Sequence, residues 1–477
     1  MKTETVRPNI SNFIKSLRDI GYSFEIAVAD IIDNSISATA KNIDIIIKPE
    51  PELVFELFDD GIGMNEKELI EAMRLATKNP DNKREKSDLG RFGLGLKTAS
   101  FSQCKLLTVL SKKDEIINAR QWDLEYISNE DEWKLIIPKK NCLKKFNQYE
   151  KLINCDSGTL VVWEQIDRYD KKLFSKKISE LIDHISLVFH RFLEAKPGMQ
   201  KLDIKINNIS VEPFDPFNKN HPATQQIPDE IIYQFGEQVV IQPYILPHHS
   251  KIERTEYDYY ATKEGYIKSQ GFYLYRENRL LIYGTWWGLH RVTDAHKLVR
   301  IKVDITSDQD KYWGIDIKKS KAYPTSEMKT ELKRIINKIT VKGSRPYSGR
   351  GKKILDKTTT KFWNLIADNG KIRFVLNQEH PVLKRLYDEL DAEQLMLFDK
   401  YLKCIQSYIP VEAIQAQLQE RPHDVDQKGI IAANEALELI SYLENSGSDL
   451  AELIKTEIYK DRIYHRATGC CMGAAGS

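Results

Sequence analysis

The sequence predicts an α/β protein of several domains, and three observations lead to this fold class. Residues 1–200 alternate helical periodicity with short apolar runs and favour mostly non-parallel strands, which is typical of an α/β sandwich. Residues 201–341 are rich in strand-like segments and close on a helix, as in an α+β domain. Residues 358–465 show a helical pattern. We expect a linker over residues 342–357 and a disordered tail over residues 466–477.

The composition is that of a folded chain with its own core. Of the 477 residues, 41% are hydrophobic and 29% are charged, and the net charge of +2 neither indicates nor excludes a nucleic-acid partner. The six cysteines form no C-x-x-C pair, so we expect neither a disulfide framework nor a zinc site. The first residues lack a signal pattern, and no run approaches the ~18 apolar residues of a membrane span. We therefore expect a cytoplasmic protein with no membrane segment.

Local patterns predict the elements of the first domain in order. Residues 10–40 form two helices, and "NIDIIIKPE" and "LVFELFDDGIGMN" form two strands. Asn65 and Glu68 resemble a capping box at the start of a helix, "EKELIEAMRLAT". Residues 78–95 are polar and glycine-bearing and predict a loop. "CKLLTVLSK" and "SGTLVVWEQI" are further strands, and "KKISELIDHISLVFHRFL" is one amphipathic helix.

The second domain is predicted from three strand-like segments, "QGFYLYRENRLLIYG", "LVRIKVDIT" and "YWGIDIKKS", followed by a helix, "SEMKTELKRIINKIT". The linker "KGSRPYSGRGKKILDK" carries six basic residues against one acid. Such a segment either neutralises phosphates of a nucleic acid or is simply solvated. Two tryptophans and three arginines of the second domain form either a stacking platform for bases or part of the core: Arg276, Arg279, Arg291, Trp286 and Trp287.

The segment "EIAVADIIDNSISATA" predicts a helix with a narrow polar stripe on an apolar surface. Wound at helical pitch, Asp33, Asn34 and Ser37 lie on the same side as Asp30. A surface helix has the inverse pattern, so this helix is mostly buried and opens one face to something wet or charged. The stripe is either a set of local hydrogen bonds or a site for Mg²⁺ and water. In the second case Asn34 offers an oxygen ligand and Asp30 orients or deprotonates a water.

Two glycine-rich segments follow this helix. In "FDDGIGMN" a strand delivers Asp59 to its end, where the carboxylate can accept a hydrogen bond from a ligand's amino group, and Gly61 and Gly63 let the backbone turn sharply. In "DLGRFGLGLKTAS" the glycine spacing resembles a P-loop, but Lys97 arrives one place late. The segment is therefore a turn, or a phosphate cradle at the start of a helix.

These segments together, with "SGTLVVW", resemble in order and spacing the GHKL ATPase superfamily, whose members include gyrase B, heat-shock chaperones, histidine kinases and MutL. The resemblance covers about 160 residues. It implies a Bergerat-type α/β sandwich that binds ATP and Mg²⁺. Asn34 is then the Mg²⁺ ligand, Asp59 the partner of the adenine amino group, and Asp30 the general base. The family's usual base is Glu, so Asp30, one methylene shorter, departs from the pattern.

The resemblance also implies a set of nucleotide-binding residues. Residues 78–92 would form an ATP lid, and Thr159 would lie near the adenine. The implied set is Asn34, Asp59, Gly61, Gly63, Met64, Gly90, Arg91, Phe92, Gly93, Leu94, Gly95, Lys97 and Thr159.

Within the superfamily, "FGLGLKTAS", "GFYLYRENRLLIYG" and "INNISVEPFDP" are similar to MORC-like proteins. Such proteins pair the ATPase with a transducer domain whose lysine reaches the γ-phosphate. In "GIDIKKSKAYP", expected at the end of a strand, we assign that lysine to Lys319, with Lys318 and Lys321 as rivals.

The resemblance therefore implies a slow, Mg²⁺-dependent ATPase that forms an ATP-gated homodimer and acts on DNA, in DNA handling or in genome and phage defence. Unidentified proteins would bind the helical C-terminal region. Two alternatives stay open. One is an ATP switch that does not hydrolyse, because Asp30 is too short. The other is a chaperone-like remodeller without DNA affinity.

Overall fold

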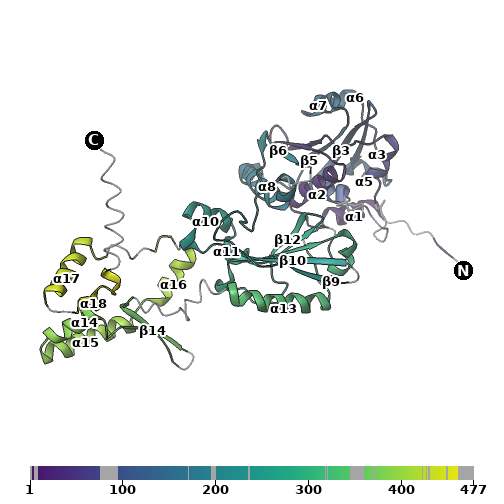
Figure 1. Ribbon diagram of the computed structural model, residues 1–477. Coiled ribbons are helices and arrows are strands. Elements are labelled where there is room, and N and C mark those ends of the chain that lie inside the picture. The colour runs from purple at the N-terminus through teal and green to yellow at the C-terminus, as the bar shows by residue number, and fades with distance from the viewer. Residues whose placement is uncertain are drawn as a thin grey trace. The chain divides into compact units, whose positions relative to one another are not determined.

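The computed structural model describes residues 3–4, 9–75, 95–169, 171–194, 200–234, 237–316, 318–319, 321–343, 359–368, 371–421, 423–425, 427, 430–446 and 449–459. The chain divides into two compact units, residues 1–344 and residues 345–477 (Figure 1). The first unit holds two sheets with their helices, and the second holds a hairpin and helices. The predicted α/β class is confirmed.

The first sheet of unit 1 contains, within the described residues, seven strands in the order β4-β3-β5-β2-β1-β6-β7. Neighbouring strands run antiparallel except for β1 and β6, which are parallel. This mixed sheet agrees with the predicted non-parallel arrangement. The strands are β1 (Asn42–Lys48), β2 (Val54–Asp59), β3 (Cys104–Lys113), β4 (Ile116–Asp123), β5 (Gly158–Ile166), β6 (Asp203–Ile206) and β7 (Ile209–Ser210).

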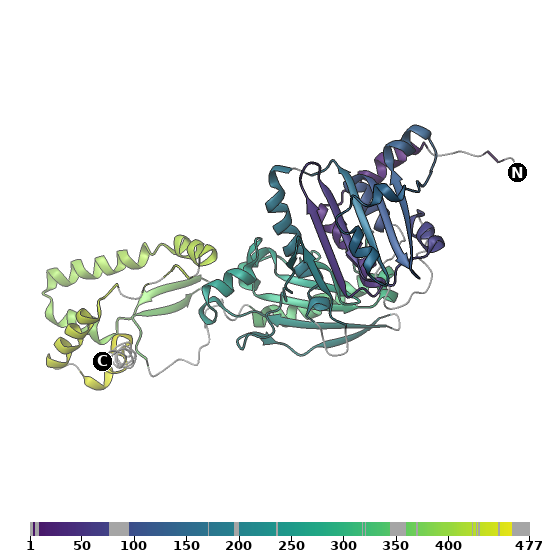
Figure 2. The same cartoon turned by 90° about the horizontal axis from the view of Figure 1, so that it is seen from above.

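Both faces of the first sheet are covered, each by its own apolar core. Alternate residues of one strand point to opposite faces and therefore enter different cores. On β2, Leu57 joins the large core and Phe58 joins a smaller one. Figure 2 shows the strands of this sheet side by side, with helices packed against them. The large core includes residues of α1 (Ile10–Arg18), α2 (Phe24–Ser37), α3 (Glu66–Met73), α4 (Gly95–Gln103), α5 (Leu124–Glu130), α8 (Phe174–Val188) and α9 (His190–Leu193). The smaller core includes residues of α6 (Lys140–Leu143) and α7 (Tyr149–Asn154).

The second sheet of unit 1 has the order β12-β11-β13-β10-β8, with β9 paired to β10. Helix α13 (Ser326–Gly343) contributes buried residues at helical spacing, among them Met328, Leu332 and Ile335. The predicted closing helix is thus confirmed. The other elements in the described part of unit 1 are β8 (Gln225–Gln226), β9 (Glu230–Gln234), β10 (Glu237–Ile245), α10 (Arg254–Ala261), α11 (Gly265–Lys268), β11 (Gly271–Arg276), β12 (Arg279–Thr285), β13 (Val299–Ile305) and α12 (Asp310–Trp313), with 3-10 turns at Lys171–Leu173, His249–Lys251, Asp294–His296 and Ser307–Gln309.

Three expectations about unit 1 differ from the structure. The strand expected in "YWGIDIKKS" is wrong: Thr306 and Gln309 form a capping box that starts a helical turn, and Gly314 ends α12 in the left-handed conformation (φ +51°). The single helix expected after residue 175 is interrupted at Phe189, between α8 and α9. Strand β6 pairs with β1 and β7 pairs with β6, so the first sheet extends past residue 200.

Unit 2 is helical, as predicted, but it begins with a hairpin of β14 (Trp363–Asp368) and β15 (Lys371–Leu376). The Asn369-Gly370 pair in the sequence is a strong hairpin signal that the helical interpretation passed over. The helices are α14 (Pro381–Glu389), α15 (Ala392–Ser407), α16 (Val411–Glu420), α17 (Ala433–Asn445) and α18 (Leu450–Leu453). The tail over residues 466–477 and most of the linker over residues 342–357 lie outside the described residues. Among those described, no helix has the length and apolar character needed to cross a membrane.

Candidate functional site

Helix α2 carries two buried carboxylates, Asp30 and Asp33, on the polar stripe that the sequence predicts. Ser23 caps the helix by accepting a hydrogen bond from the backbone of Ile26. The apolar residues around the stripe pack into the large core, which leaves Asp30 2% and Asp33 1% exposed. Carboxylates at this depth need charged or hydrogen-bonding partners, because an unpaired buried charge is costly.

Three residues supply those partners. The Lys319 ammonium donates to Asp30 Oδ1 at 3.1 Å and to Asp33 Oδ2 at 2.5 Å. Arg279 Nε donates to Asp33 Oδ1 at 2.7 Å, and its Nη2 lies 3.9 Å from Asp30 Oδ1. The Tyr22 hydroxyl donates to Asp30 Oδ2 at 3.0 Å. Two carboxylates, two cations and a phenol therefore meet in one cluster, and Lys319 and Arg279 come from the second sheet's part of unit 1.

The pKa values in the cluster follow from its burial. Burial raises the pKa of Asp30 above its ordinary value; Lys319 opposes this rise, Asp33 adds to it and Arg279 opposes it. Burial also raises the pKa of Tyr22, and the Asp30 carboxylate adds to that rise. A carboxylate with a raised pKa accepts a proton more readily once ionised. Asp30 is thus a more basic carboxylate than a solvent-exposed aspartate.

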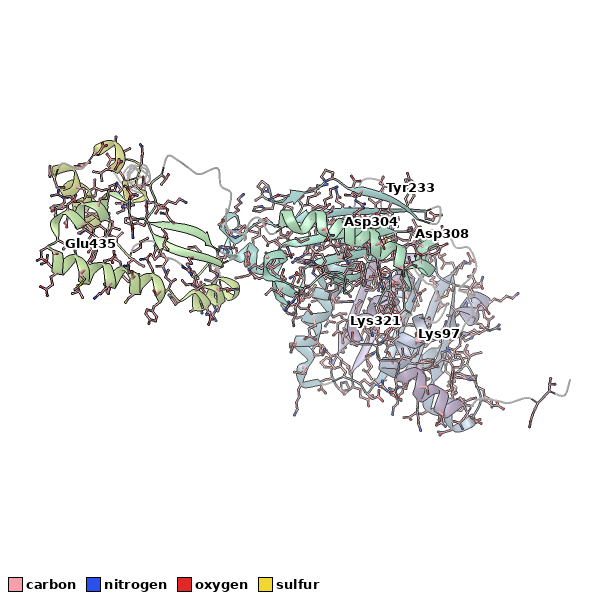
Figure 3. The ribbon with its side chains drawn as sticks, turned by 90° about the horizontal axis from the view of Figure 1, so that it is seen from below. Lys97, Tyr233, Asp304, Asp308, Lys321 and Glu435 are labelled. Carbon is pink, nitrogen blue, oxygen red and sulfur yellow. The ribbon has the colours of Figure 1, made fainter. Side chains whose placement is uncertain are left out.

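The loop after α12 explains why Lys319, rather than its neighbours, reaches the carboxylates. Lys319 has φ +54°, and its backbone N–H donates to the carbonyl of Asp316, whose own N–H donates to the carbonyl of Lys321. Lys318 instead donates to the backbone carbonyls of Ile20 and Gly21. Lys321 is exposed (Figure 3), and its backbone N–H bonds the Asp316 carboxylate. Among the three rival lysines, the structure brings Lys319 to Asp30.

Asp59 forms a second buried centre at the end of β2. Its Oδ2 accepts from the Ser35 hydroxyl at 2.8 Å and its Oδ1 accepts from the Gly61 backbone at 3.0 Å. Burial raises the pKa of Asp59 from 3.8 to about 6, although these two hydrogen bonds act to lower it. A carboxylate has about four acceptor positions. Asp59 therefore has capacity left for the amino group of a ligand.

The residues beside Asp59 fix the backbone around it. Gly63 has φ +63°, and a Cβ there would lie 1.9 Å from the Lys112 carbonyl oxygen, so no other residue fits. A Cβ on Gly61 would lie 2.8 Å from the Ala38 carbonyl oxygen. Thr159 pairs with Asp59 across β5 and β2. The Ser111 hydroxyl connects Met64 to Thr159. It accepts a hydrogen bond from the Met64 backbone N–H at 2.8 Å and lies 2.9 Å from the Thr159 hydroxyl.

Asn34 lies at the exposed end of the polar stripe. Its amide nitrogen donates a hydrogen bond to the Asp30 backbone carbonyl at 3.0 Å. This bond does not use the amide oxygen, which is the atom that would coordinate a hard cation. Within the described residues, no three His, Cys, Asp or Glu side chains gather to hold a metal. A single amide oxygen fits Mg²⁺, which usually keeps its waters and binds substrate phosphates.

The start of α4 lies beside Asp30. Gly95 opens the helix, and a Cβ there would lie 3.8 Å from Asp30 Oδ2. Lys97 is buried and donates to the carbonyl of Ala72 at 2.9 Å, so its predicted role at phosphates stays a prediction (Figure 3). The other predicted phosphate-binding residues lie outside the described residues: Gly90, Arg91, Phe92, Gly93 and Leu94.

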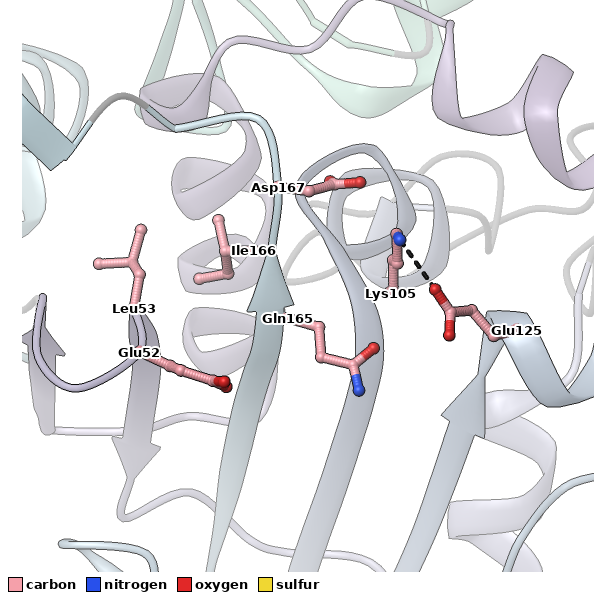
Figure 4. Close-up of a pocket in the computed structure, with 7 residues that line it drawn as sticks. All are labelled: Glu52, Leu53, Lys105, Glu125, Gln165, Ile166 and Asp167. Atoms are coloured by element: carbon pink, nitrogen blue, oxygen red, sulfur yellow. Dashed lines mark hydrogen bonds and ion pairs between the residues drawn. The ribbon is translucent and has the colours of Figure 1, made fainter.

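A separate hollow of about 350 Å³ lies at the far end of the same sheet (Figure 4). Gln165 and Ile166 at the end of β5 line it, whereas Thr159 stands at the start of that strand, roughly 20 Å away at the usual rise per residue. Two of the lining residues are hydrogen-bonded: the Lys105 ammonium donates to the Glu125 carboxylate at 2.8 Å. The hollow is therefore distinct from the Asp30 and Asp59 centres. Its lining is Glu52, Leu53, Lys105, Glu125, Gln165, Ile166 and Asp167.

The stacking platform considered from the sequence is not formed. Arg276 and Arg279 are each 3% exposed and Trp286 is 3% exposed, so these side chains cannot stack on bases at the surface. Sequence reasoning also missed the roles of Arg279, Tyr22, Ser35 and Ser111 in the site. Ser35 adjoins the predicted stripe, but nothing in the sequence near Tyr22 or Ser111 connects either residue to Asp30 or Asp59.

Comparison with known proteins supports the resemblance. Residues 22–159 match the model of the histidine kinase-, DNA gyrase B-, and HSP90-like ATPase family. ATPase morc-1 of Caenorhabditis elegans is 32% identical over 119 residues, 25% of this chain and 14% of that protein. ATPase MORC2B of Mus musculus is 27% identical over 116 residues, 24% of this chain and 11% of that protein. DNA mismatch repair protein MutL of Rickettsia prowazekii is 32% identical over 95 residues, 20% of this chain and 16% of that protein.

The matched segments therefore span less than a fifth of each of these relatives. The residues that match the family model, 22–159, include Asp30, Asn34 and Asp59. Residues 22–159 match the model of this ATPase family, and part of the chain is similar to MORC ATPases and to MutL.

Proposed function

We propose that this protein binds ATP with Mg²⁺ and hydrolyses it. The observation that carries the proposal is the contact between Lys319 and Asp30, which come from opposite ends of unit 1 in the sequence and meet in one buried cluster. A site of this kind has a carboxylate to act on water and a cation for the phosphate charge. The Asp59 centre supplies the acceptor for the adenine amino group.

Each group has a defined task in this proposal. Asp59 accepts a hydrogen bond from the adenine, beside the backbone shaped by Gly61 and Gly63. Asn34 holds Mg²⁺, which screens phosphate charge and orients the phosphates. Asp30 takes a proton from the attacking water, and its raised pKa favours this. Lys319 moves its ammonium to the terminal phosphate, where it stabilises the charge that develops in the transition state.

The larger mechanism follows from differential binding. ATP favours a closed state in which Lys319 contacts the terminal phosphate, and ADP lacks that contact, so hydrolysis shifts the population back. We propose that the closed state is a dimer and that it acts on DNA. The support is the similarity to MORC ATPases and to the mismatch repair protein MutL, together with the basic residues 342–357 of the sequence. A role in genome or phage defence remains part of this proposal.

A phosphate-release assay with purified full-length protein tests the proposal. Wild-type protein should release phosphate from Mg·ATP, and Asp30→Asn should lower the rate by roughly 10²–10⁴-fold, the usual effect of losing a general base. Binding of Mg·ATP without phosphate release by wild-type protein would favour a switch that does not hydrolyse. One observation favours this alternative: Lys319 and Tyr22 each donate a hydrogen bond to Asp30, so both carboxylate oxygens already have a partner.

DNA affinity needs its own test. A gel shift with duplex DNA at increasing salt should show retention that weakens as salt rises, because phosphate contacts release counterions. Light scattering with and without a non-hydrolysable ATP analogue measures the molar mass and so shows whether the analogue causes dimerisation. Absence of DNA retention at low salt would favour the chaperone-like alternative.

A further inference from the structure

In the buried cluster, Asp33 has two cationic partners, and one of them, Lys319, also bonds Asp30. Asp33 accepts from Lys319 through Oδ2 at 2.5 Å and from Arg279 through Oδ1 at 2.7 Å. Both carboxylate oxygens thus have a cationic donor. The Arg279 side chain is 4% exposed and its guanidinium also lies 5.6 Å from the centre of the Phe189 ring. Arg279 is fixed from two sides, whereas Lys319 stands on a loop.

Arg279 is held at this position by a tight hairpin. Glu277 and Asn278 both have positive φ, +47° and +70°, which makes a two-residue turn of the hairpin type. Arg276 therefore faces Arg279 directly across β11 and β12. Asn278 Oδ1 accepts from Arg191 of α9 at 3.4 Å. The hairpin tip is consequently attached to the part of unit 1 that carries α2.

The same hairpin also holds the root of the Lys319 loop. Arg276 donates to both oxygens of Asp310, Nε to Oδ1 at 2.6 Å and Nη2 to Oδ2 at 2.9 Å. Asp310 begins α12, and the loop with Lys319 follows that helix. The two arginines that face each other in this hairpin thus hold two groups in place while Lys319 moves. Arg279 holds the Asp33 carboxylate, and Arg276 holds Asp310 at the base of the Lys319 loop.

We propose that Arg279 is a positioning residue that holds Asp33 so that Lys319 can move from the carboxylates to the terminal phosphate of a bound nucleotide. The proposal rests on the proposed ATP site. Asp33 is 1% exposed and cannot be left without a cation. With Arg279 in place, departure of Lys319 leaves Asp33 paired. Without Arg279, Lys319 remains the sole cation hydrogen-bonded to Asp33 among the described residues, and it is retained there.

The test compares affinities and does not depend on turnover. Calorimetry with Mg²⁺ gives the ratio of the dissociation constants for ADP and for a non-hydrolysable ATP analogue. Wild-type protein should prefer the analogue, because Lys319 contacts its terminal phosphate. R279Q should lose roughly tenfold or more of this preference, the value of one charged hydrogen bond, with ADP affinity unchanged. R291Q, which alters an exposed arginine of the same unit, is the matched control and should keep the preference.

The double variant D33N/R279Q separates positioning from a general effect on folding. Removal of the Asp33 charge removes the group that retains Lys319, so the preference for the analogue should return toward the wild-type ratio. R279K keeps a cation at Asp33 and should also keep most of the preference. Thermal unfolding without nucleotide reports whether each variant folds.

Each result decides one question. An unchanged ratio in R279Q overturns the proposal, and so does a double variant that is no better than R279Q. If R279Q does not fold, R279K and D33N/R279Q carry the test, and loss of the preference in either one overturns the proposal. Wild-type protein that binds both nucleotides equally also overturns it, since Lys319 then does not reach the terminal phosphate. Wild-type protein that binds neither nucleotide contradicts the proposed function itself.

Discussion

Lys319 donates a hydrogen bond of 3.1 Å to Asp30, a residue 289 positions earlier in the sequence. The bond joins the loop after α12 to the middle of α2 inside unit 1. It places an ammonium, which can neutralise phosphate charge, beside a carboxylate that can accept a proton. The lysine and the carboxylate of the proposed reaction are therefore in contact in this structure.

The first prediction concerns that lysine. Lys319→Ala should lower the turnover of ATP by about 10²-fold, because a donor to the developing phosphate charge is lost. It should also lower the affinity for ATP, but not for ADP, by roughly tenfold, because the contact with the terminal phosphate is lost. Steady-state phosphate release at several ATP concentrations separates the two effects. Lys321→Ala is the control, since this neighbouring lysine is exposed, and it should behave as wild type. Equal losses in both variants would show that the loop, not the Lys319 ammonium, matters.

The second prediction concerns the proton acceptor. Asp30→Asn should keep nucleotide binding and lose hydrolysis by roughly 10²–10⁴-fold. Single-turnover phosphate release, with bound nucleotide measured in parallel, checks both statements. Asp30→Glu restores the base usual in the superfamily and should keep hydrolysis. Because Asp30 is fully enclosed, the added methylene should cost about 1–3 kcal/mol of stability. Retention of full activity by Asp30→Asn would mean that another group takes the proton.

The third prediction uses the pKa of Asp59. Folding raises this pKa from 3.8 to about 6, so the ionised carboxylate destabilises the folded protein above that range, by up to roughly 3 kcal/mol at neutral pH. Asp59→Asn should therefore raise the unfolding temperature of the nucleotide-free protein at pH 8. The gain should shrink as the pH falls from about 6 toward 4, where the wild-type carboxyl becomes protonated. Thermal unfolding at pH 8 and pH 5 measures the difference.

The same substitution should weaken ATP binding. The adenine amino group would lose a charged acceptor, which is worth about 1.5–3 kcal/mol, or roughly 10- to 150-fold in affinity. Calorimetry with ATP checks this loss. Stability and binding thus change in opposite directions. A variant that is less stable and binds ATP normally would remove Asp59 from the adenine site.

The sequence predicts those parts of the molecule that depend on local patterns. The stripe on α2 and the position of Asp59 at the end of β2 follow from helical and strand periodicity, and the Asn65 cap is also observed. The strand expected near Lys319 fails because Gly314 takes a left-handed conformation that ends α12. Apolar spacing over "YWGIDI" does not reveal that bend.

Partners that are distant in sequence could not be predicted. Arg279 binds Asp33 across 246 residues and Ser111 reaches Thr159 across 48, and neither pairing leaves a local signal. Tyr22 precedes the predicted stripe by eight residues and joins Asp30 because the chain turns between α1 and α2. The sequence thus identifies the carboxylates and, through the resemblance, Lys319, whereas Arg279 and the hydroxyl donors emerge from tertiary packing.

The last prediction separates two glycines that the sequence treats alike. Gly63 has φ +63° and its missing Cβ would overlap the Lys112 carbonyl, so Gly63→Ala should cost at least about 2 kcal/mol of stability. Gly95 opens α4 with the nearest atom, Asp30 Oδ2, 3.8 Å from an added Cβ. Gly95→Ala should therefore change stability by no more than about 1 kcal/mol. Thermal unfolding of both variants gives the comparison.

Nucleotide binding then distinguishes a structural from a functional role for Gly95. If phosphates approach the backbone at the start of α4, a methyl group beside Asp30 should reduce affinity for the ATP analogue more than affinity for ADP. Calorimetry on folded Gly95→Ala protein measures both. The Gly63→Ala protein should instead lose affinity for both nucleotides alike, because the backbone beside Asp59 is displaced. Wild-type affinity for both nucleotides in Gly95→Ala would place the phosphates away from α4, and Gly95 would then be an ordinary first residue of a helix.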